Sequence, residues 1–540
     1  MGEGIVNWYR EKVKNESKIA FFSAILIGLL TYLYKFVNNL PSGDSLFNTY
    51  STQNMVGSGR WFLAVPCAVS SFFDLPWVTG LFSLIYIAVA AVFIIKLFEV
   101  TNPFLITLIS GFLVTSPAVV ETLYYSFTAD GYMAAMMMVT IAVYLLRFDN
   151  RKIIDKVIAV VLICLACGIY QVYLSFGLVL TLCYFMYHLS IDSHKTKEYL
   201  VWVAQQFVVF AVGTGIYMAV WKIILAISHS SATEYAGADS LSLGNFIEAI
   251  SSSIQNSVIF FLQWNVAIDG FTVYNVLNLL FLLAGAVILV AVLLKSGLTR
   301  RYVHLLLFLG SLVLIPISAC IFQFVTGVSQ YPARMLYSMT LIYILNAIFC
   351  EKWCKNAVKN VFATLLAVII FNNFLTANMY WYKVEQSVEY SRYTAEEIAM
   401  RIHEFDDGTD IPIAFVGRAS FQADSVFTDP SEYGQLGLMY YHVYDSLVEN
   451  RSYAILFLEE ELGFRMSYYS NHPEAELPKF YPNPNEPAYE PYDLHFRVLD
   501  YEESYQIGFT DEVRNMGVWP AQDSVGLVNG VIVVKFSEPV

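Results

Sequence analysis

Two side chains of opposite charge lie in a short polar segment directly after the first apolar run of the chain. The segment LPSGDSLFNTYSTQNMVGSGRW covers residues 40–61 and contains one acid, Asp44, and one base, Arg60. A carboxylate at this place can take a proton from an acceptor hydroxyl. A guanidinium can bind the oxygens of a phosphate through two parallel hydrogen bonds. Asp44 also precedes SLFNTY, so N-capping of a short helix is the structural alternative.

Two more charged residues are candidates for the same chemistry. Asp130 ends the segment TLYYSFTAD and could act as a second carboxylate, with helix capping as its alternative. Arg334, in SQYPARMLY, could be a second phosphate-binding group, with a snorkelling arginine at the end of a membrane span as its alternative.

Two further residues are candidates for substrate binding. Gln171, in GIYQVY, is polar between two apolar runs, and an interhelical hydrogen bond is its alternative. Lys535, in VIVVKF, falls on the same strand face as Val531 and Val533, an unusual place for a solvated lysine. Protection of an edge strand is the alternative for Lys535.

The elements that carry these residues are predicted to be membrane spans. The chain has 540 residues, of which 57% are apolar and 14% are charged. In soluble domains about 45–50% of the residues are apolar and about 25% are charged. Apolar runs of membrane-spanning length recur along the chain and predict an α-helical polytopic membrane protein with about eleven transmembrane helices. The predicted spans are 19–36, 77–98, 103–120, 131–147, 153–168, 172–188, 201–226, 272–295, 302–325, 335–350 and 358–378.

Basic residues between the spans predict the orientation. Lys and Arg gather before the first span and after the fourth, sixth, eighth and tenth. All these groups lie on one side if the N-terminus is cytoplasmic and a break at 168–171 separates the fifth and sixth spans. The outer segments are then 37–76, 121–130, 169–171, 227–271, 326–334 and everything after 378. Segment 227–271 is expected to contain a helix lying along the outer interface and a short re-entrant stretch.

The charge distribution divides the chain into three parts. We expect a cytoplasmic leader over 1–18, a transmembrane domain over 19–382 and an acidic extracytoplasmic domain over 383–540. Residues 1–382 have a net charge of +4, whereas residues 383–540 contain 10 Lys/Arg and 28 Asp/Glu, a net charge of −18. An acidic domain argues against nucleic acid as a partner.

The acidic part contains alternating helical and extended patterns. A helical pattern continues over 380–403 and another covers 431–449, while strand-like runs occur at 412–416, 453–458 and 531–536. The alternation predicts a small α/β domain. The Pro- and Asn-rich stretch YPNPNEPAYEPY predicts an irregular loop.

The motifs of soluble enzymes and metal sites are missing from the sequence. It has no Walker lysine loop, no HExxH and no GxSxG. Cys164 and Cys167 form a CxxC inside an apolar run, where packing is expected, because a zinc site needs more ligands. No cofactor and no metal dependence are therefore expected.

The quoted motifs together resemble the phage-type O-antigen glucosyltransferase family, the polytopic glucosyl transferase type II group. The resemblance covers nearly the whole chain. It rests on NNLPSGD with Asp44, SGRW with Arg60, YQVYLS with Gln171, and the terminal MGVWPAQDSVGLVNGVIVVKFS. It implies a GT-C-like fold in a bacterial cytoplasmic membrane, with the active site and the C-terminal domain outside. The implied substrates are a sugar, most often glucose, on undecaprenyl phosphate and a surface glycan, and the implied partners are membrane lipids and an upstream donor synthase and flippase.

This resemblance assigns roles to the candidate residues. Asp44, or else Asp130, is expected to be the general base, while Arg60 and Arg334 bind the lipid phosphate and Gln171 and Lys535 bind substrate. A single base favours inversion at the sugar carbon, because retention requires a separate nucleophile. The alternatives are a polysaccharide polymerase or ligase, and a transporter or flippase of lipid-linked sugars.

Overall fold

The computed structural model describes two compact units, each built from segments that are distant in the sequence. The described residues are 14–150, 152–191, 194–233, 243–262, 273–326, 331–405, 411–417, 454–455, 457–458, 467–468 and 496–539. Those in 14–39 and 52–379 form the first unit, which we call the helical unit. Those in 40–51 and 380–539 form the second, which we call the mixed unit.

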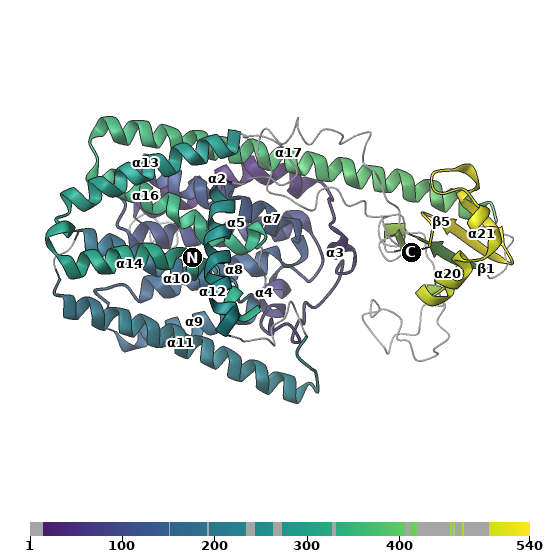
Figure 1. The fold of residues 1–540 in the computed structure, drawn as a ribbon, viewed down its shortest axis with the longest axis horizontal. Helices are drawn as coiled ribbons and strands as arrows, with labels where there is room; N and C mark the ends of the chain where they lie inside the picture. The colour runs from purple at the N-terminus through teal and green to yellow at the C-terminus, as the bar shows by residue number, and fades with distance from the viewer. Residues whose placement is uncertain are drawn as a thin grey trace, which may run out of the picture. The chain divides into compact units, whose positions relative to one another are not determined.

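The helical unit is built from helices (Figure 1). Its helices are α2 (Asn15–Val37), α4 (Ala64–Val69), α5 (Pro76–Leu97), α6 (Pro103–Thr115), α7 (Pro117–Tyr124), α8 (Ser126–Leu145), α9 (Ile153–Ile169), α10 (Tyr173–Ile191), α11 (Thr196–Ile227), α12 (Leu243–Leu262), α13 (Val273–Lys295), η1 (Leu298–Arg300), α14 (Tyr302–Ala319), α15 (Gln323–Thr326), η2 (Ala333–Met339), α16 (Thr340–Trp353) and the first half of α17 (Asn356–His403).

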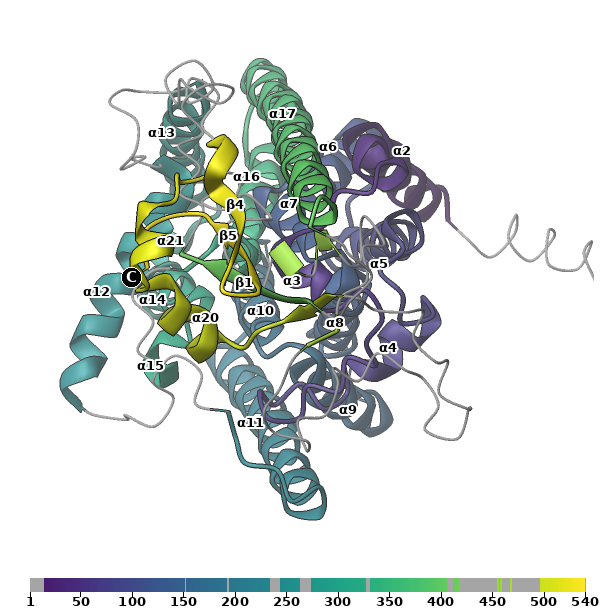
Figure 2. The same cartoon turned by 90° about the vertical axis from the view of Figure 1, so that its right-hand side faces the viewer.

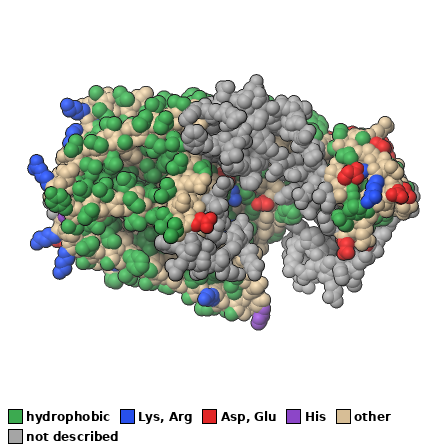
Figure 3. Space-filling view, in the orientation of Figure 1, with side chains coloured by type: hydrophobic (Ala, Val, Ile, Leu, Met, Phe, Trp, Pro, Cys, Tyr) green, Lys and Arg blue, Asp and Glu red, His purple; other side chains and the backbone are tan. Residues whose placement is uncertain are grey.

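The lengths of these helices identify a multi-pass membrane protein. Within the described residues, ten helical stretches are long and apolar enough to cross a membrane. Hydrophobic side chains cover the flank of the helical unit, and Lys and Arg gather at the end where α13 and α14 are joined (Figure 3). The sequence predicted about eleven spans; the additional one corresponds to α9, which has only 17 residues.

Two predictions about helix ends have opposite outcomes. The predicted break between the fifth and sixth spans is confirmed, because α9 ends at Ile169 and α10 begins at Tyr173. The predicted outer loop 121–130 is wrong, because these residues are helical in α7 and α8 with an interruption at Tyr125. Apolar periodicity locates the centre of a span well but not its ends.

Small residues allow the helices of the unit to approach closely. Helix α2 packs against α5 and α6, and α5 packs against α8 (Figure 2). A β-carbon on Gly28 of α2 would lie 2.5 Å from Leu84 of α5, and one on Gly177 of α10 would lie 2.4 Å from Val139 of α8. Such contacts hold helices together in lipid, where no hydrophobic driving force favours helix over lipid.

The mixed unit contains a sheet and several helices. Its helices are α3 (Gly43–Leu46), the second half of α17, α20 (Tyr501–Gly508), α21 (Asp511–Asn515) and η4 (Gln522–Ser524). The strands are β1 (Ile411–Val416), β2 (Ser467–Tyr468), β3 (Phe496–Val498), β4 (Val525–Val528) and β5 (Val531–Lys535), in the order β2-β3-β1-β5-β4. Among the described strands, β4 and β5 pair antiparallel and the other pairs are parallel. Ala414, Val416, Leu499, Val513 and Val533 form its apolar core.

The predicted elements of the acidic part have mixed outcomes. The helix over 380–403 and the strands at 412–416 and 531–536 are confirmed within one or two residues by α17, β1 and β5. The strand at 453–458 is wrong, since its described residues, Ala454, Ile455, Phe457 and Leu458, are helical. A short continuous apolar run is compatible with either conformation. The predicted helix 431–449 and the Pro- and Asn-rich loop lie outside the described residues.

A glycine substitution tests the packing of α10 on α8. We expect Gly177→Ala to lower the free energy of unfolding by about 1–3 kcal/mol, because its new methyl group meets Val139. Gly215→Ala in α11 is the matched control, since no atom lies within 4 Å of its added β-carbon. The control should gain up to about 1 kcal/mol from helix propensity. Denaturant titration of both proteins in detergent measures the difference, and equal stabilities would contradict this packing.

Candidate functional site

Arg60 is presented by a tight turn that follows the first polar segment. The backbone N–H of Arg60 donates to the carbonyl oxygen of Met55 at 3.1 Å, and the two residues form an isolated antiparallel bridge. Gly59 has a φ of +79°, a left-handed conformation that favours glycine. A β-carbon at Gly59 would also lie 2.4 Å from the hydroxyl of Tyr217 and 2.5 Å from Nε2 of Gln171. Both constraints require glycine here.

The side chains of Gln171 and Trp221, together with backbone hydrogen bonds, hold this turn in place. Nε2 of Gln171 donates to the carbonyl oxygen of Ser58 at 2.9 Å and to the hydroxyl of Tyr217 at 2.8 Å. Nε1 of Trp221 donates to the carbonyl oxygen of Val56 at 2.7 Å. The backbone N–H of Phe62 donates to the carbonyl oxygen of Gly168 at 2.8 Å. The turn is therefore fixed from α11, from the end of α9 and from the α9–α10 connection.

The alternative role for Gln171 was a hydrogen bond between helices. Gln171 forms such a bond from the α9–α10 connection to Tyr217 of α11. Its amide nitrogen is occupied by that bond and by the Ser58 carbonyl. A direct contact between Gln171 and substrate stays a prediction.

The guanidinium of Arg60 lies among aromatic rings. Its Nη1 donates to the hydroxyl of Tyr132 at 2.9 Å. Its central carbon lies 4.8 Å from the ring centre of Tyr170 and 5.8 Å from that of Tyr132. The two rings stack on each other with their centres 4.4 Å apart. The contact with the Tyr170 ring and the hydrogen bond to Tyr132 restrict the orientation of the guanidinium while preserving its charge.

Arg334 lies at the start of η2 and pairs with an acid of α7 that the sequence analysis did not single out. Its Nη1 forms an ion pair with Oε1 of Glu121, and its backbone N–H donates to Oε2 of Glu121 at 2.9 Å. The guanidinium carbon lies 4.6 Å from the ring centre of Tyr125. The side chains of Arg334 and Glu121 are only 19% and 8% exposed. The snorkelling alternative is therefore wrong, because the arginine binds inward.

The two arginines belong to one cluster. Tyr170 and Tyr132, the two tyrosines that Arg60 contacts, also lie close to Arg334. We call Arg60, Arg334, Glu121 and Tyr125, Tyr132 and Tyr170 the arginine–tyrosine cluster. Glu121 could have been found from the sequence as an acid at the end of a predicted span, where it needs a cation to be stable.

Asp130 occupies a different environment from the one that the sequence predicted. It is the fifth residue of α8 and is fully buried, so it does not cap the helix. Its Oδ1 accepts a hydrogen bond from the backbone N–H of Gly131 at 2.8 Å and lies 4.0 Å from the sulfur of Cys67. Burial and the Asp130 carboxylate raise the pKa of the Cys67 thiol, so this thiol stays protonated and can donate. A role of Asp130 as general base stays a prediction.

A second carboxylate, Asp74, lies near Asp130, and a buried lysine lies near Asp74. Lys35, in the last turn of α2, is 1% exposed and interacts electrostatically with Asp74. Asp74 accepts a hydrogen bond from the hydroxyl of Ser126 at 2.9 Å, and Ser126 opens α8. The sequence analysis missed Lys35 and Asp74, although a lysine at the end of a span that the sequence predicts to be outer is unusual and indicates a partner.

Asp44 belongs to the mixed unit and lies in the first turn of α3. The cap of this helix is Ser42, whose side chain accepts a hydrogen bond from the backbone N–H of Ser45. The capping alternative for Asp44 is therefore wrong. Its side chain is exposed, and within the described residues its carboxylate has no hydrogen bond or ion pair. Its role as general base stays a prediction.

Lys535 also belongs to the mixed unit and is fully buried at the end of β5. Its ammonium donates to the carbonyl oxygens of Arg514 and Met516 at 3.1 Å and pairs with Glu538 at 2.8 Å. Because β5 lies between β1 and β4, the edge-strand alternative is wrong. These contacts use the ammonium to close the end of α21, and binding of substrate by Lys535 stays a prediction.

Comparison with known proteins adds one match. A family model described as glucosyl transferase GtrII matches residues 33–350, a range that includes Asp44 and the whole arginine–tyrosine cluster but not Lys535. No curated protein and no solved structure matches the chain. The match confirms the resemblance that the sequence motifs indicated.

Single and double variants of Arg334 and Glu121 test whether the two side chains form a buried ion pair. We expect Glu121→Leu or Arg334→Met alone to lower the free energy of unfolding by roughly 3–5 kcal/mol, because each leaves a buried charge without its partner. The double variant should recover much of this loss, since no buried charge remains. Titration of the four proteins with a denaturing detergent gives the coupling energy. Strictly additive losses would mean that the two side chains do not interact.

Proposed function

The chain belongs to the GtrII glucosyl transferase family, and we propose that it moves glucose from a polyprenyl-phosphate donor to a glycan outside the cytoplasmic membrane. The coarser statement, a glycosyltransferase embedded in a membrane, follows from the family match and the ten long apolar helices. The donor, the acceptor and the roles of individual residues are our proposal.

The observation that carries the proposal is the arginine–tyrosine cluster. Two guanidinium groups from distant parts of the chain lie in one neighbourhood of the helical unit, since Arg60 contacts Tyr132 and Tyr170 and Arg334 is close enough to both for their electrostatics to affect it. Planar guanidinium groups bind phosphate oxygens through two hydrogen bonds. A phosphate that leaves a sugar gains negative charge in the transition state. Positive charge that is already held in place stabilises it there without the cost of reorganisation.

We assign the lipid phosphate to both arginines, with different roles. Glu121 holds one edge of Arg334 and the Tyr125 ring covers one face, so Arg334 has a fixed position. Arg60 is carried by the turn that Gln171 and Trp221 hold. We infer that Gln171 acts through this turn as a positioning residue, whereas the guanidinium groups contact the phosphate themselves.

Asp44 is our choice for the general base. In the proposed step the acceptor oxygen forms a bond to C1 of glucose while the bond between C1 and the phosphate oxygen breaks. The hydroxyl proton passes to the Asp44 carboxylate, and the lipid phosphate leaves with the electron pair of the broken bond. One displacement inverts the configuration at C1. The exposed carboxylate of Asp44, which does not cap α3, supports this assignment.

Asp130 is the alternative base. Its complete burial argues against contact with an acceptor hydroxyl and favours a structural role beside Cys67. The role of the arginines at the lipid phosphate is the same whichever carboxylate is the base. Variants of Asp44 and Asp130 therefore distinguish the two assignments of the general base.

The remaining features of the proposal concern location and partners. We propose a GT-C-like arrangement in a bacterial cytoplasmic membrane, with the arginine–tyrosine cluster and the acidic α/β domain on the outer side. The gathering of Lys and Arg at one end of the helical unit supports this orientation (Figure 3). The donor would come from a separate synthase and flippase. The reaction needs no metal, because lipid-linked glucose is already activated and the arginines supply the positive charge.

The Asp44→Asn variant distinguishes a catalytic role of Asp44 from a structural role. We expect Asp44→Asn to slow transfer of glucose by about 10²–10⁴-fold, because the amide cannot accept the proton. Donor binding and the melting temperature should be unchanged, since the carboxylate has no partner within the described residues. Transfer is measured with purified protein, a polyprenyl-phosphate glucose and an acceptor glycan, with Asp130→Asn beside it. Normal transfer by Asp44→Asn and loss in Asp130→Asn would assign the base to Asp130. Normal transfer by both would refute base catalysis by either residue.

The Arg60→Lys variant tests whether Arg60 binds the lipid phosphate. We expect Arg60→Lys to weaken donor binding and to slow transfer by at least about tenfold, because an ammonium keeps the charge but loses the planar, stacked fork. Arg300→Lys is the matched control, since Arg300 lies in η1 at the opposite end of the spans. Donor binding is measured by competition with a labelled lipid-phosphate sugar. Wild-type binding and turnover in Arg60→Lys would remove Arg60 from the donor site.

A further inference from the structure

A cavity of the helical unit lies away from the arginine–tyrosine cluster, between the start of α6, the end of α16 and the start of α17. Its volume is about 390 Å³, within the usual range for small-molecule sites. All three helices meet a membrane boundary here, because the apolar spans that contain them begin at Pro103 and Asn356 and end at Trp353. The cavity therefore opens where lipid head groups lie.

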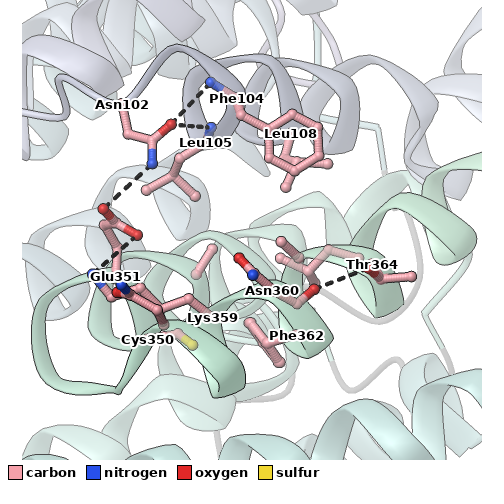
Figure 4. A pocket seen from close by; sticks show the side chains of 14 residues that line it. Asn102, Phe104, Leu105, Leu108, Cys350, Glu351, Lys359, Asn360, Phe362 and Thr364 are labelled. Atoms are coloured by element: carbon pink, nitrogen blue, oxygen red, sulfur yellow. Dashed lines mark hydrogen bonds and ion pairs between the residues drawn. The ribbon is translucent and has the colours of Figure 1, made fainter.

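The mouth of the cavity is polar and contains one lysine. Oε1 of Glu351 lies 3.4 Å from Nδ2 of Asn102, and Oε2 of Glu351 lies 3.5 Å from Nζ of Lys359 (Figure 4). The amides of Asn356 and Asn360 line the same opening. The Lys359–Glu351 distance is long for an ion pair, and both side chains are about one-third exposed, so their attraction is weak.

The floor of the cavity is apolar. Leu105, Leu108, Phe362 and Leu366 line it, and all four are at most 7% exposed. One turn further along, a β-carbon on Gly111 of α6 would lie 3.1 Å from Ile370 of α17, so the two helices touch there and the cavity ends. The helices thus separate only at the boundary, with a polar opening above an apolar floor.

Positive charge surrounds the opening. Lys352, Lys355 and Lys359 lie within eight residues of one another between α16 and α17, and Lys295 donates to the carbonyl oxygen of Trp353 at 2.7 Å. Glu351 is the acid that faces Lys359. A group of lysines next to the end of a membrane span attracts lipid phosphates, by about 1 kcal/mol for each lysine.

We propose that this cavity binds the head group of an anionic phospholipid. Its phosphate is bound by Lys359 and the amides of Asn356 and Asn360, while the first part of one acyl chain lies on Leu105, Leu108 and Phe362. The rest of the lipid extends into the membrane past Phe104, which is 57% exposed at the opening. Glu351 competes with the phosphate for Lys359, so it sets the affinity. The proposal is independent of the transfer reaction.

The test uses native mass spectrometry of the full chain with added phosphatidylglycerol. Lys359→Ala should weaken binding about fivefold, the loss expected for one lysine at a lipid phosphate. Glu351→Gln should strengthen it, because the competing charge is removed. Lys352→Ala, exposed at the same end but outside the cavity lining, is the matched control and should weaken binding less than Lys359→Ala does. Ala363→Trp should abolish binding by filling the cavity without changing its charge.

Two further ligands distinguish sources of phosphate. Inorganic phosphate at millimolar concentration should not displace the phospholipid, because it lacks the apolar chain. Displacement by it would overturn the proposal in favour of a simple anion site. Stronger binding of a polyprenyl phosphate than of phosphatidylglycerol would also overturn it, since the cavity would then serve the sugar carrier. Wild-type phospholipid binding by both Lys359→Ala and Ala363→Trp, with each variant folded, would show that the lipid binds elsewhere.

Discussion

The ion pair between Glu121 and Arg334 is the contact on which the proposed donor site depends. It joins α7 to η2, two segments separated by 213 residues. In an apolar bundle neither charge is stable alone, so each requires the other at that place. Once the pair has formed, Arg334 lies over Tyr125 and close to the tyrosines that Arg60 contacts. The position of one guanidinium is thus determined by a buried carboxylate.

Arg60 reaches the same tyrosines by another route. The turn that carries it has no regular secondary structure, and its backbone carbonyls are bound instead by Gln171 and Trp221. Irregular backbone near a membrane requires such partners, because unpaired carbonyls are costly where water is scarce. Gly59 allows Gln171 and Tyr217 to approach, so one glycine connects the conformation of the turn to the direction of Arg60. The polar residues around the turn therefore serve its shape as much as its chemistry.

The two boundaries of the helical unit differ in chemistry. Tyrosine rings surround the guanidinium groups at one end, whereas exposed lysines and an open amphiphilic cavity occupy the other. Rings hold a guanidinium in a fixed direction, which suits a reaction with defined geometry. A lysine on a flexible stem binds phosphate as a point charge without fixed geometry, which suits a structural lipid. Charged groups beside apolar surface occur at both ends, and we propose that they serve catalysis at one end and lipid binding at the other.

The sequence alone determined that this is a multi-pass membrane protein, the break between α9 and α10, and the family, because apolar periodicity, Lys/Arg bias and local motifs are all properties of short stretches. It also directed attention to Asp44, Arg60 and Arg334.

Only the tertiary structure decided that Arg334 pairs with Glu121, that Ser42 and not Asp44 caps α3, and that Asp130 lies inside a helix. It also decided that the buried Lys535 binds the end of α21, which β-strand alternation could not show. These outcomes depend on contacts between residues distant in sequence or on the exact end of a helix. Periodicity locates an element and its buried face, but the partner of a buried charge depends on which other elements pack against that face.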